Sequence, residues 1–435
     1  MRPLYLFLSS FALVVWTVGG SAAPLESKLS APYFDKFHPI KAPEPAGLLL
    51  KKGDRLAICG DSITEQKMYS RIMETYLTVC MPELEITARQ YGWSGERAGG
   101  FLSRMTNDCL RFNPTIATTC YGMNDHEYKP YEARIGNIYW DRSTAIIRAF
   151  KAHGVRVVQG SPGAVGKMPD WVKTASGTVD DLNVNLCQLR DIGIAISRRE
   201  HVAFADVFWP MLTTGYEAQQ KYGTNYMITG KDGVHPGWAG QTEMAYAFLK
   251  ALGCDGHIGT LTVNLASGKL KASKGHRVLS SQDGKYEMKS ERYPFCATGK
   301  IDDDNSIRSG MALVPFNQNL NRFLLVGKGG KASNYKVTWG TNSKVYSAEA
   351  LAKGVNLADD FVENPFCQAF QKVDKAVEAK QIYETKQIKE IFHGPEGKKD
   401  METAVKMTEG ERAPLAAAIR QSFVPVTYTL AIEPL

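Results

Sequence analysis

The chain has 435 residues, of which 44% are hydrophobic and 22% are charged, so it is long enough for a main domain with additions and has a globular composition. Its formal net charge of +7 is small for this length. No cluster of lysine and arginine is interleaved with aromatic residues, and we therefore exclude nucleic acid as an expected partner.

Residues 1–23 have the features of a secretory signal peptide. A single charge at Arg2 is followed by an apolar run from Leu4 through Val18 and by small residues at 21–23. An uncleaved membrane anchor is the alternative, but the run is short for a spanning helix and no later stretch is apolar enough to cross a bilayer. We expect a secreted or periplasmic protein, not stably membrane-inserted after cleavage, in which the eight cysteines can form disulfides of unknown pairing.

After an extended lead-in at 24–54, short apolar runs alternate with amphipathic stretches over residues 55–255. Parallel β-α-β units have this pattern, because both faces of their sheet are covered by helices. It predicts an α/β domain with a three-layer α/β/α arrangement. The expected strands are 55–59, 85–90, 115–121, 155–160 and 202–207, and the expected helices are 67–80, 97–111, 139–153, 181–199 and 237–252.

The pattern changes after Cys254. Residues 256–345 alternate polar and apolar side chains between glycine-rich turns, which predicts an antiparallel β-rich insert or small domain. Residues 346–435 predict a helical hairpin and a returning strand. Its first helix is expected to begin at Asn364 and Pro365 and to end at Gly394, followed by a helical region at 400–422 and a strand at 426–432. The apolar stripe on the first helix is expected to contact its own chain, although oligomer formation through these helices is also open.

The apolar run at 55–59 ends in Gly60-Asp61-Ser62, and the next helix is expected near Gln66. A serine at the carboxyl end of a sheet strand is well placed to act as a nucleophile if a base lies nearby. A plain turn or helix cap would also explain this motif.

Three further stretches are expected at the same sheet edge. Gly95 follows the second strand and would let a backbone N–H approach a substrate oxygen, and Asn124 follows the third strand and could donate its side-chain amide to the same oxygen. Asp232 lies three residues before His235, where it could hold the imidazole in the tautomer that accepts the Ser62 proton. Each has an ordinary reading as a turn, cap or surface residue, but four such stretches at one edge indicate a catalytic site.

Together these residues resemble the first, second, third and fifth sequence blocks of the SGNH hydrolase superfamily, also called GDSL-type esterases and lipases. The matching segments are Gly60-Asp61-Ser62-Ile63, Gly95, Gly122-Met123-Asn124-Asp125 and Asp232-Gly233-Val234-His235, and they span residues 55 to about 252. The resemblance implies a flavodoxin-like fold and a hydrolase with Ser62, His235 and Asp232 as catalytic triad. It also implies an oxyanion hole formed by the backbone N–H groups of Ser62 and Gly95 and the side chain of Asn124.

No metal or organic cofactor is expected. No Cys-x-x-Cys or His-x-x-x-His pair occurs, and the acidic run 302–305 fits a solvated turn better than a calcium loop.

Aromatic residues near the triad suggest the substrate. Trp93, Tyr121 and Trp238 could stack on sugar rings and His126 could bond a hydroxyl, although Trp238 could equally pack on its own helix. A polar segment at 213–231 argues against an apolar lid. We therefore expect an exported serine esterase that removes short acyl groups, above all acetyl, from carbohydrate or another small ester. The alternatives are a lipase, lysophospholipase or thioesterase of the same superfamily, and an inactive domain serving as a carbohydrate-binding or assembly module.

Overall fold

A computed structural model describes residues 24–435, so the secretory signal predicted for 1–23 lies outside the described residues. Five parallel strands form the central sheet in the order β2-β1-β3-β4-β5. This is the flavodoxin-like order, and the chain reverses direction across the sheet between β1 and β3. The strands are β1 (Arg55–Gly60), β2 (Thr87–Gln90), β3 (Ile116–Cys120), β4 (Arg156–Gly160) and β5 (Ala203–Ala205).

Alternate residues of β1 point to opposite faces of this sheet, and helices cover both faces. Leu56 and Ile58 pack with α2 (Tyr69–Cys80) and α7 (Trp238–Ala251), whereas Ala57 and Cys59 pack with α3 (Ala98–Asp108) and α4 (Ala133–Ala152). Burial on both faces explains why the strands are apolar throughout. The predicted three-layer α/β/α fold is confirmed.

The sequence missed helix α6 (Phe208–Tyr222), which follows β5. Most of the segment 213–231, expected as a polar rim, therefore lies in a helix. The hydroxyl of Thr214 donates to the buried carboxylate of Glu243 on α7, 2.9 Å away, so the polar residues of this segment partly serve contacts between helices. Helix α5 (Val179–Glu200) lies close to its predicted range and begins with a capping box formed by Thr178 and Asp181.

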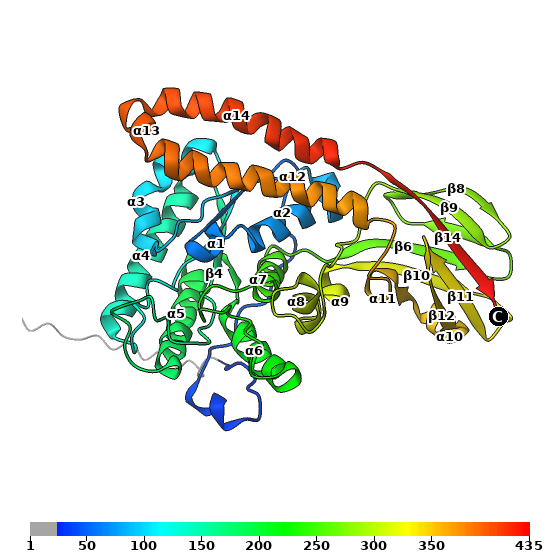
Figure 1. The fold of residues 1–435 in the computed structure, drawn as a ribbon, viewed down its shortest axis with the longest axis horizontal. Coiled ribbons are helices and arrows are strands. Elements are labelled where there is room, and N and C mark those ends of the chain that lie inside the picture. The colour runs from blue at the N-terminus through cyan, green and yellow to red at the C-terminus, as the bar shows by residue number, and fades with distance from the viewer. Residues whose placement is uncertain (1–23) are drawn as a thin grey trace, which may run out of the picture.

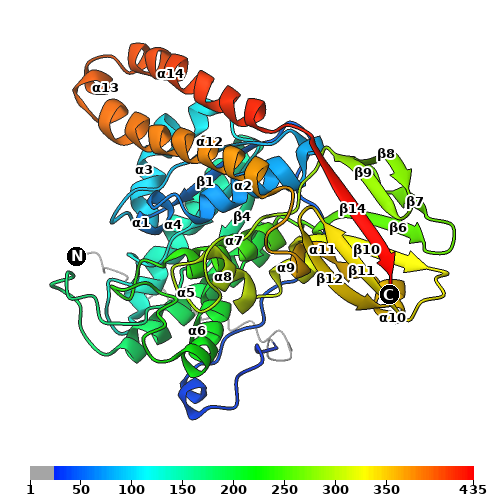
Figure 2. The ribbon, with the colours of Figure 1, turned by 45° about the vertical axis from the view of Figure 1, so that its right-hand side comes forward.

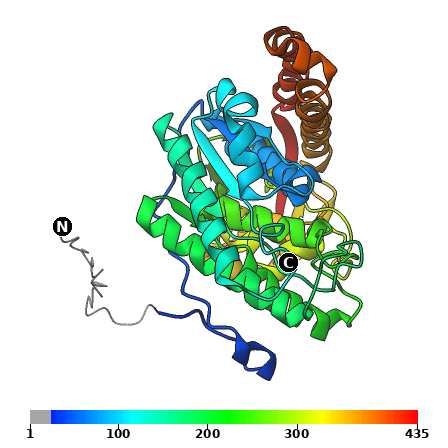
Figure 3. The same ribbon diagram turned by 90° about the vertical axis from the view of Figure 1, so that its left-hand side faces the viewer.

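The lead-in before β1 is extended except for one short 3₁₀ turn at Pro32–Lys36. It runs along the outside of the α/β domain (Figure 3). Phe34 and Phe37 are buried against Trp209 of α6, and the buried guanidinium of Arg190 donates to the carbonyl of Ile40 at 2.7 Å. These contacts make the lead-in part of the domain surface.

Two further sheets follow the α/β domain. A four-stranded sheet has the order β13-β10-β6-β7, and a five-stranded sheet has the order β12-β11-β14-β9-β8. They meet face to face, and the ring of Phe323 on β10 stacks on that of Trp339 on β11 at 5.4 Å. The strands are β6 (His257–Asn264), β7 (Lys269–Ala272), β8 (His276–Gln282), β9 (Lys285–Ser290), β10 (Arg322–Lys328), β11 (Asn334–Trp339), β12 (Asn342–Ser347), β13 (Val355–Asn356) and β14 (Val426–Pro434).

The expected β-rich region is present, but one strand pair differs from the expected antiparallel pattern. Strands β6 and β10 pair in parallel. Strands β7, β8 and β9 and the helices α8 (Ile307–Leu313) and α9 (Phe316–Leu320) lie between them in the chain, so the connection is long enough for a parallel pair. Strand β14 lies between β9 and β11, so the end of the chain occupies the middle of the five-stranded sheet (Figure 2).

The predicted helical hairpin is confirmed. Helix α12 (Cys367–Lys386) continues through a π-helical segment (Gln387–Phe392), and after α13 (Pro395–Lys399) the chain returns as α14 (Met401–Ser422). The hairpin runs over the α/β domain alongside α2 (Figure 1). Arg71 of α2 pairs there with Asp374 and Glu378 of α12.

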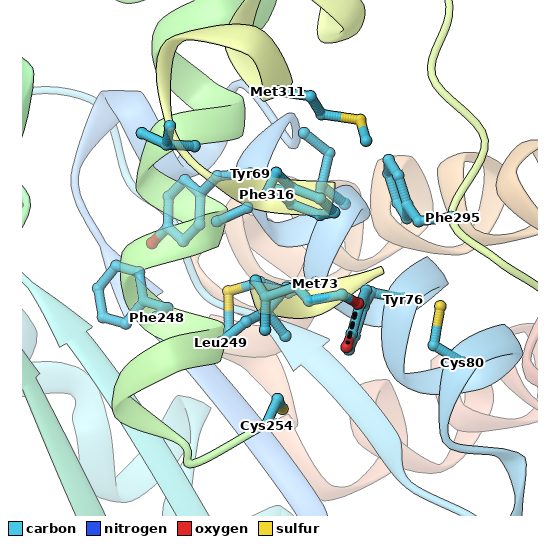
Figure 4. Packing of buried hydrophobic residues seen from close by; sticks show 14 of the residues in the cluster. Tyr69, Met73, Tyr76, Cys80, Phe248, Leu249, Cys254, Phe295, Met311 and Phe316 are labelled. Atoms are coloured by element: carbon cyan, nitrogen blue, oxygen red, sulfur yellow. Dashed lines mark hydrogen bonds between the residues drawn. The ribbon is translucent and has the colours of Figure 1, made fainter. Parts of the chain in front are cut away.

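The α/β domain and the C-terminal part share one hydrophobic core. Phe295, Met311 and Phe316 pack against side chains of α2 and α7 (Figure 4), and Tyr76 of α2 donates to the carbonyl oxygen of Leu320 at 2.8 Å. All eight cysteines carry free thiols, and Cys59 and Cys120 are buried. Within residues 24–435 no helix has both the length and the apolar character needed to cross a bilayer.

Candidate active site

Ser62 is the first residue of a four-residue helix, α1 (Ser62–Glu65), at the carboxyl end of β1. The expected helix start near Gln66 is wrong, because Asp61 already caps this short helix by accepting from the N–H of Ile63 at 3.0 Å. Burial raises the pKa of Asp61 to about 7. Because α1 follows β1 directly, the half-buried Ser62 lies at the carboxyl ends of β1 and β3, where the strand order reverses.

The structure brings Ser62, His235 and Asp232 into one hydrogen-bonded series. His235 Nε2 lies 2.8 Å from Ser62 Oγ, and His235 Nδ1 lies 2.6 Å from Asp232 Oδ2. The other oxygen of Asp232 accepts from the N–H groups of Val234 and His235 at 3.0 and 2.9 Å. Partial burial works against the charged form, but these bonds outweigh it and lower the pKa of Asp232. An anionic Asp232 favours a proton on Nδ1, which leaves Nε2 free to accept from Ser62.

The loop that carries Asp232 and His235 closes tightly in front of α7. Gly230 has φ +84°, and a Cβ there would lie 1.8 Å from the carbonyl oxygen of His235. Only glycine fits this turn, which brings the histidine back toward Ser62.

Gly95 and Asn124 lie on the loops after β2 and β3. Gly95 is exposed at φ +73°, while Asn124 is buried. The hydroxyl of Tyr128 donates to Asn124 Oδ1 at 3.2 Å, and Asn124 Nδ2 donates to the carbonyl of Glu96 at 3.1 Å. These bonds set the orientation of the amide and leave Nδ2 one further hydrogen for a ligand.

Two of the expected substrate contacts are wrong. Tyr121 is buried and stacks on Phe101 of α3, because it continues the alternation of β3 toward that face of the sheet, and its hydroxyl donates to Glu96. His126 is fully buried, with Nδ1 bonded to the carbonyl of Met123. Burial lowers the pKa of His126 to about 4, so the ring is neutral near pH 7.

The two tryptophans named from the sequence are half-buried. The Trp93 ring lies edge-on to the His393 ring at 4.9 Å and has the Lys389 ammonium 5.2 Å from its centroid, so it faces the C-terminal hairpin. Trp238 lies beside the Arg71 guanidinium, 5.6 Å from the ring centroid. Its role as a packing residue of α7, the alternative left open above, fits this contact.

An aromatic residue that the sequence analysis missed lies next to the triad. Trp171 is 46% exposed, and its ring lies 5.7 Å from that of His235 and 5.7 Å from that of Tyr128. It stands in the irregular segment between β4 and α5, where no periodic pattern marks it. Glu65 was also missed, although its place three residues after Ser62 puts it on the same short helix.

Residues 24–435 contain no group of three or more His, Cys, Asp or Glu side chains arranged to hold a metal ion.

Comparison with known proteins covers the region that contains these residues. The model of the GDSL-like Lipase/Acylhydrolase family matches residues 58–242, which contain Ser62, Gly95, Asn124, Asp232 and His235. No curated protein matches the chain significantly.

Among solved structures, a gut microbial diltiazem-metabolizing enzyme has the same fold over both parts of the chain. Its TM-score is 0.70 at 21% identity, covering 90% of this chain and 100% of that one. An acetylxylan esterase from Geobacillus stearothermophilus aligns at 19% identity with a TM-score of 0.40 over 47% of this chain and 97% of its own. An α/β hydrolase from the metagenome of Lake Arreo aligns at 19% identity with a TM-score of 0.37, over 48% and 99% respectively.

Proposed function

We propose that this chain is an exported serine esterase that removes short acyl groups, above all acetyl, from carbohydrate. Its residues 58–242 match the model of the GDSL-like lipase/acylhydrolase family, which supports a carboxylic ester hydrolase. The observation that carries the proposed mechanism is the series from Asp232 through His235 to Ser62, with distances of 2.6 and 2.8 Å.

The reaction proceeds by two acyl transfers. His235 Nε2 takes the Ser62 proton as Oγ attacks the ester carbonyl, and the resulting oxyanion is met by the N–H groups of Ser62 and Gly95 and by the Asn124 amide. His235 then protonates the leaving alcohol. In the second step His235 takes a proton from water, the resulting hydroxide attacks the acyl-enzyme, and the acid leaves as Ser62 regains its proton.

The polar surroundings of Ser62 support a short acyl group. Glu65, Ser94 and Lys389 form a hydrogen-bonded group that begins on the same short helix as the nucleophile. Such surroundings offer little burial to an acyl tail, where each buried CH₂ contributes about 0.8 kcal/mol.

An exposed aromatic face beside the catalytic histidine supports a carbohydrate as the alcohol half of the ester. The flat ring of Trp171 suits the apolar face of a sugar, and Arg97, which pairs with Glu127 at 3.0 Å, is exposed at the start of α3 and can bond hydroxyl groups.

Export is proposed from the composition of residues 1–23, with their apolar run and small residues at 21–23. Amino-terminal sequencing of protein recovered from the medium or periplasm of a bacterial host should begin close to Pro24. Full-length protein retained in the membrane fraction would instead favour an anchor.

Two assays test the activity. A fluorophosphonate probe should label the wild-type protein and not the Ser62→Ala variant, whereas no labelling of either would favour an inactive binding module. Acetate release from a panel of acetylated polysaccharides then tests the substrate, and diltiazem belongs in the panel because the gut enzyme of the same fold metabolizes it.

A series of p-nitrophenyl esters tests the acyl length. Activity should fall steeply from acetate to octanoate. A rise with chain length would move the protein to the lipase class.

A further inference from the structure

The loop that carries Gly95 has one end anchored inside the α/β domain. Glu96 is buried, forms an ion pair with Arg104 at 2.7 Å, and accepts the Asn124 amide on its carbonyl. Gly95 itself is exposed, and a Cβ built on it would meet no atom within 4 Å. The Glu96 N–H donates to the carbonyl oxygen of Trp93 at 3.1 Å and closes the turn that contains Gly95, so the direction of the Gly95 N–H depends on the residues on either side.

The other end of this loop is held by Glu65. The Glu65 carboxylate accepts from both the backbone N–H and the hydroxyl of Ser94, the latter at 2.6 Å. Because Glu65 lies on α1 with Ser62, these bonds connect the residue before Gly95 to the helix that begins with the nucleophile.

The second partner of Glu65 comes from the C-terminal hairpin. Lys389, in the π-helical segment, reaches both Glu65 oxygens at 2.7 and 3.0 Å, across 324 positions of sequence. The same ammonium lies 5.2 Å from the centroid of the Trp93 ring, and His393 contacts that ring edge-on. Two side chains of the hairpin, Lys389 and His393, thus contact Trp93 of the loop.

The Lys389 ammonium also stabilises the negative charge of the Glu65 carboxylate. Partial burial of Glu65 disfavours its charge, but the bonds from Lys389 and Ser94 prevail and lower the pKa of Glu65. The carboxylate is thereby kept in its charged form, which accepts the strongest hydrogen bonds from Ser94.

From this network we propose that Glu65 and Lys389 are positioning residues that hold the Gly95 N–H toward the oxyanion, so that the C-terminal hairpin completes the esterase site. The inference rests on the proposed function, since it assigns Gly95 to the oxyanion hole. It gives the hairpin, which lies outside residues 58–242, a part in the reaction.

Lys389→Met tests this, because methionine keeps the length of the side chain and removes the charge and the donors. With p-nitrophenyl acetate, kcat should fall about tenfold, a part of the roughly 10² to 10³-fold lost when an oxyanion donor is removed outright. KM should stay within twofold, because the donor acts mainly in the transition state. Lys389→Arg should restore most of kcat.

Lys386→Met is the matched control, since Lys386 is exposed and lies one helical turn earlier on the same hairpin. It should leave kcat unchanged. Thermal unfolding of all variants separates positioning from stability. A loss of kcat in a Lys389→Met protein that melts within about 2 °C of wild type supports positioning, whereas a loss that appears only where the protein has begun to melt overturns it.

The coupling between the two residues provides a second readout. Glu65→Gln combined with Lys389→Met should lower kcat no more than about twofold beyond the stronger single variant, because both break the same support. Independent, multiplying effects would overturn the inference. Unchanged kcat in Lys389→Met would do so too, and if Ser62→Ala is inactive the proposed function survives that result. Wild-type activity in Ser62→Ala would instead overturn the proposed function itself.

Discussion

The α/β domain and the C-terminal part are built in contrasting ways. In the α/β domain the strands that are neighbours in the sheet are also consecutive in the chain, except at β1 and β3, and three of the four blocks that reach the site follow β1, β2 and β3 directly. In the C-terminal part, β10 pairs with β6, and β14 pairs with β9 across the whole hairpin. The first region carries the residues of the candidate site in local units, and the strand pairs β6/β10 and β9/β14 of the second depend on contacts distant in sequence.

This difference suggests a division of roles. The groups proposed to react all come from residues 58–242, and the C-terminal part supplies the shared core and the Lys389 contact. Four experiments test how sharp the division is, taken from the largest expected effect to the smallest.

Ser62→Ala should lower ester hydrolysis by roughly 10⁴ to 10⁶-fold, because the nucleophile is removed while the half-buried site loses little packing. His235→Ala should be as damaging, and Asp232→Asn milder, since Asp232 orients the imidazole. Circular dichroism and thermal unfolding should match wild type. Hydrolysis by Ser62→Ala near the wild-type rate would mean that Ser62 is not the nucleophile and that the reaction does not take place at this site of the α/β domain.

A chain that ends after Cys254 tests whether the α/β domain stands alone. It would expose side chains of α2 and α7 that now pack on Phe295, Met311 and Phe316, each worth roughly 1.5 to 3 kcal/mol of burial (Figure 4). We expect low soluble yield and binding of a hydrophobic dye. A soluble truncation with full activity would show that the two parts are independent and would contradict the role given to Lys389.

Asn124→Ala should lower kcat by roughly 10² to 10³-fold with little change in KM, because the amide donor acts in the transition state. Tyr128→Phe, which removes the hydroxyl that orients Asn124 Oδ1, should have a smaller effect in the same direction. A loss confined to KM would make Asn124 a ground-state substrate contact.

Asp61→Asn should have the smallest effect, on stability alone. Burial raises the pKa of Asp61 to about 7, above the value near 3.8 in the unfolded chain. The unfolded state therefore releases this proton first, and the stability that the protonated group contributes is lost as pH rises from about 4 to about 7. Asparagine cannot ionise and still accepts from Ile63.

The free energy of unfolding of Asp61→Asn minus that of the wild type should therefore increase by at most about 3 kcal/mol between pH 5 and pH 7. Urea unfolding at three pH values measures this, and the exposed Asp141→Asn is the control. A constant difference across that range would mean that Asp61 does not carry a raised pKa.

The features that could be predicted from the sequence are mostly the local ones of the α/β domain. The strands at 55–59, 115–121 and 155–160 were predicted within one residue of their observed ends because apolar runs between helices mark them, and Asp232 and His235 lie on one loop. Tyr121 and His126 were misplaced because proximity in sequence to Asn124 does not tell which side of the backbone a side chain takes.

The features that the sequence did not reveal depend on distant contacts. Lys389 reaches Glu65 across 324 positions, and no local pattern marks that contact. Trp171 stands in irregular chain, where spacing carries no structural information. Strands β6 and β10 pair in parallel although three other strands and two small helices lie between them in the chain, and these helices were too short to predict from periodicity.

The position of β14 affects how this protein is made. The nine residues Val426–Pro434 fill the gap between β9 and β11, so during synthesis each of these strands lacks its partner on that side until residues 426–434 have left the ribosome. The α/β domain can begin to fold long before that moment. An interrupted chain therefore displays two unpaired strands to its neighbours and to proteases, which favours removal of incomplete molecules before they act as enzymes.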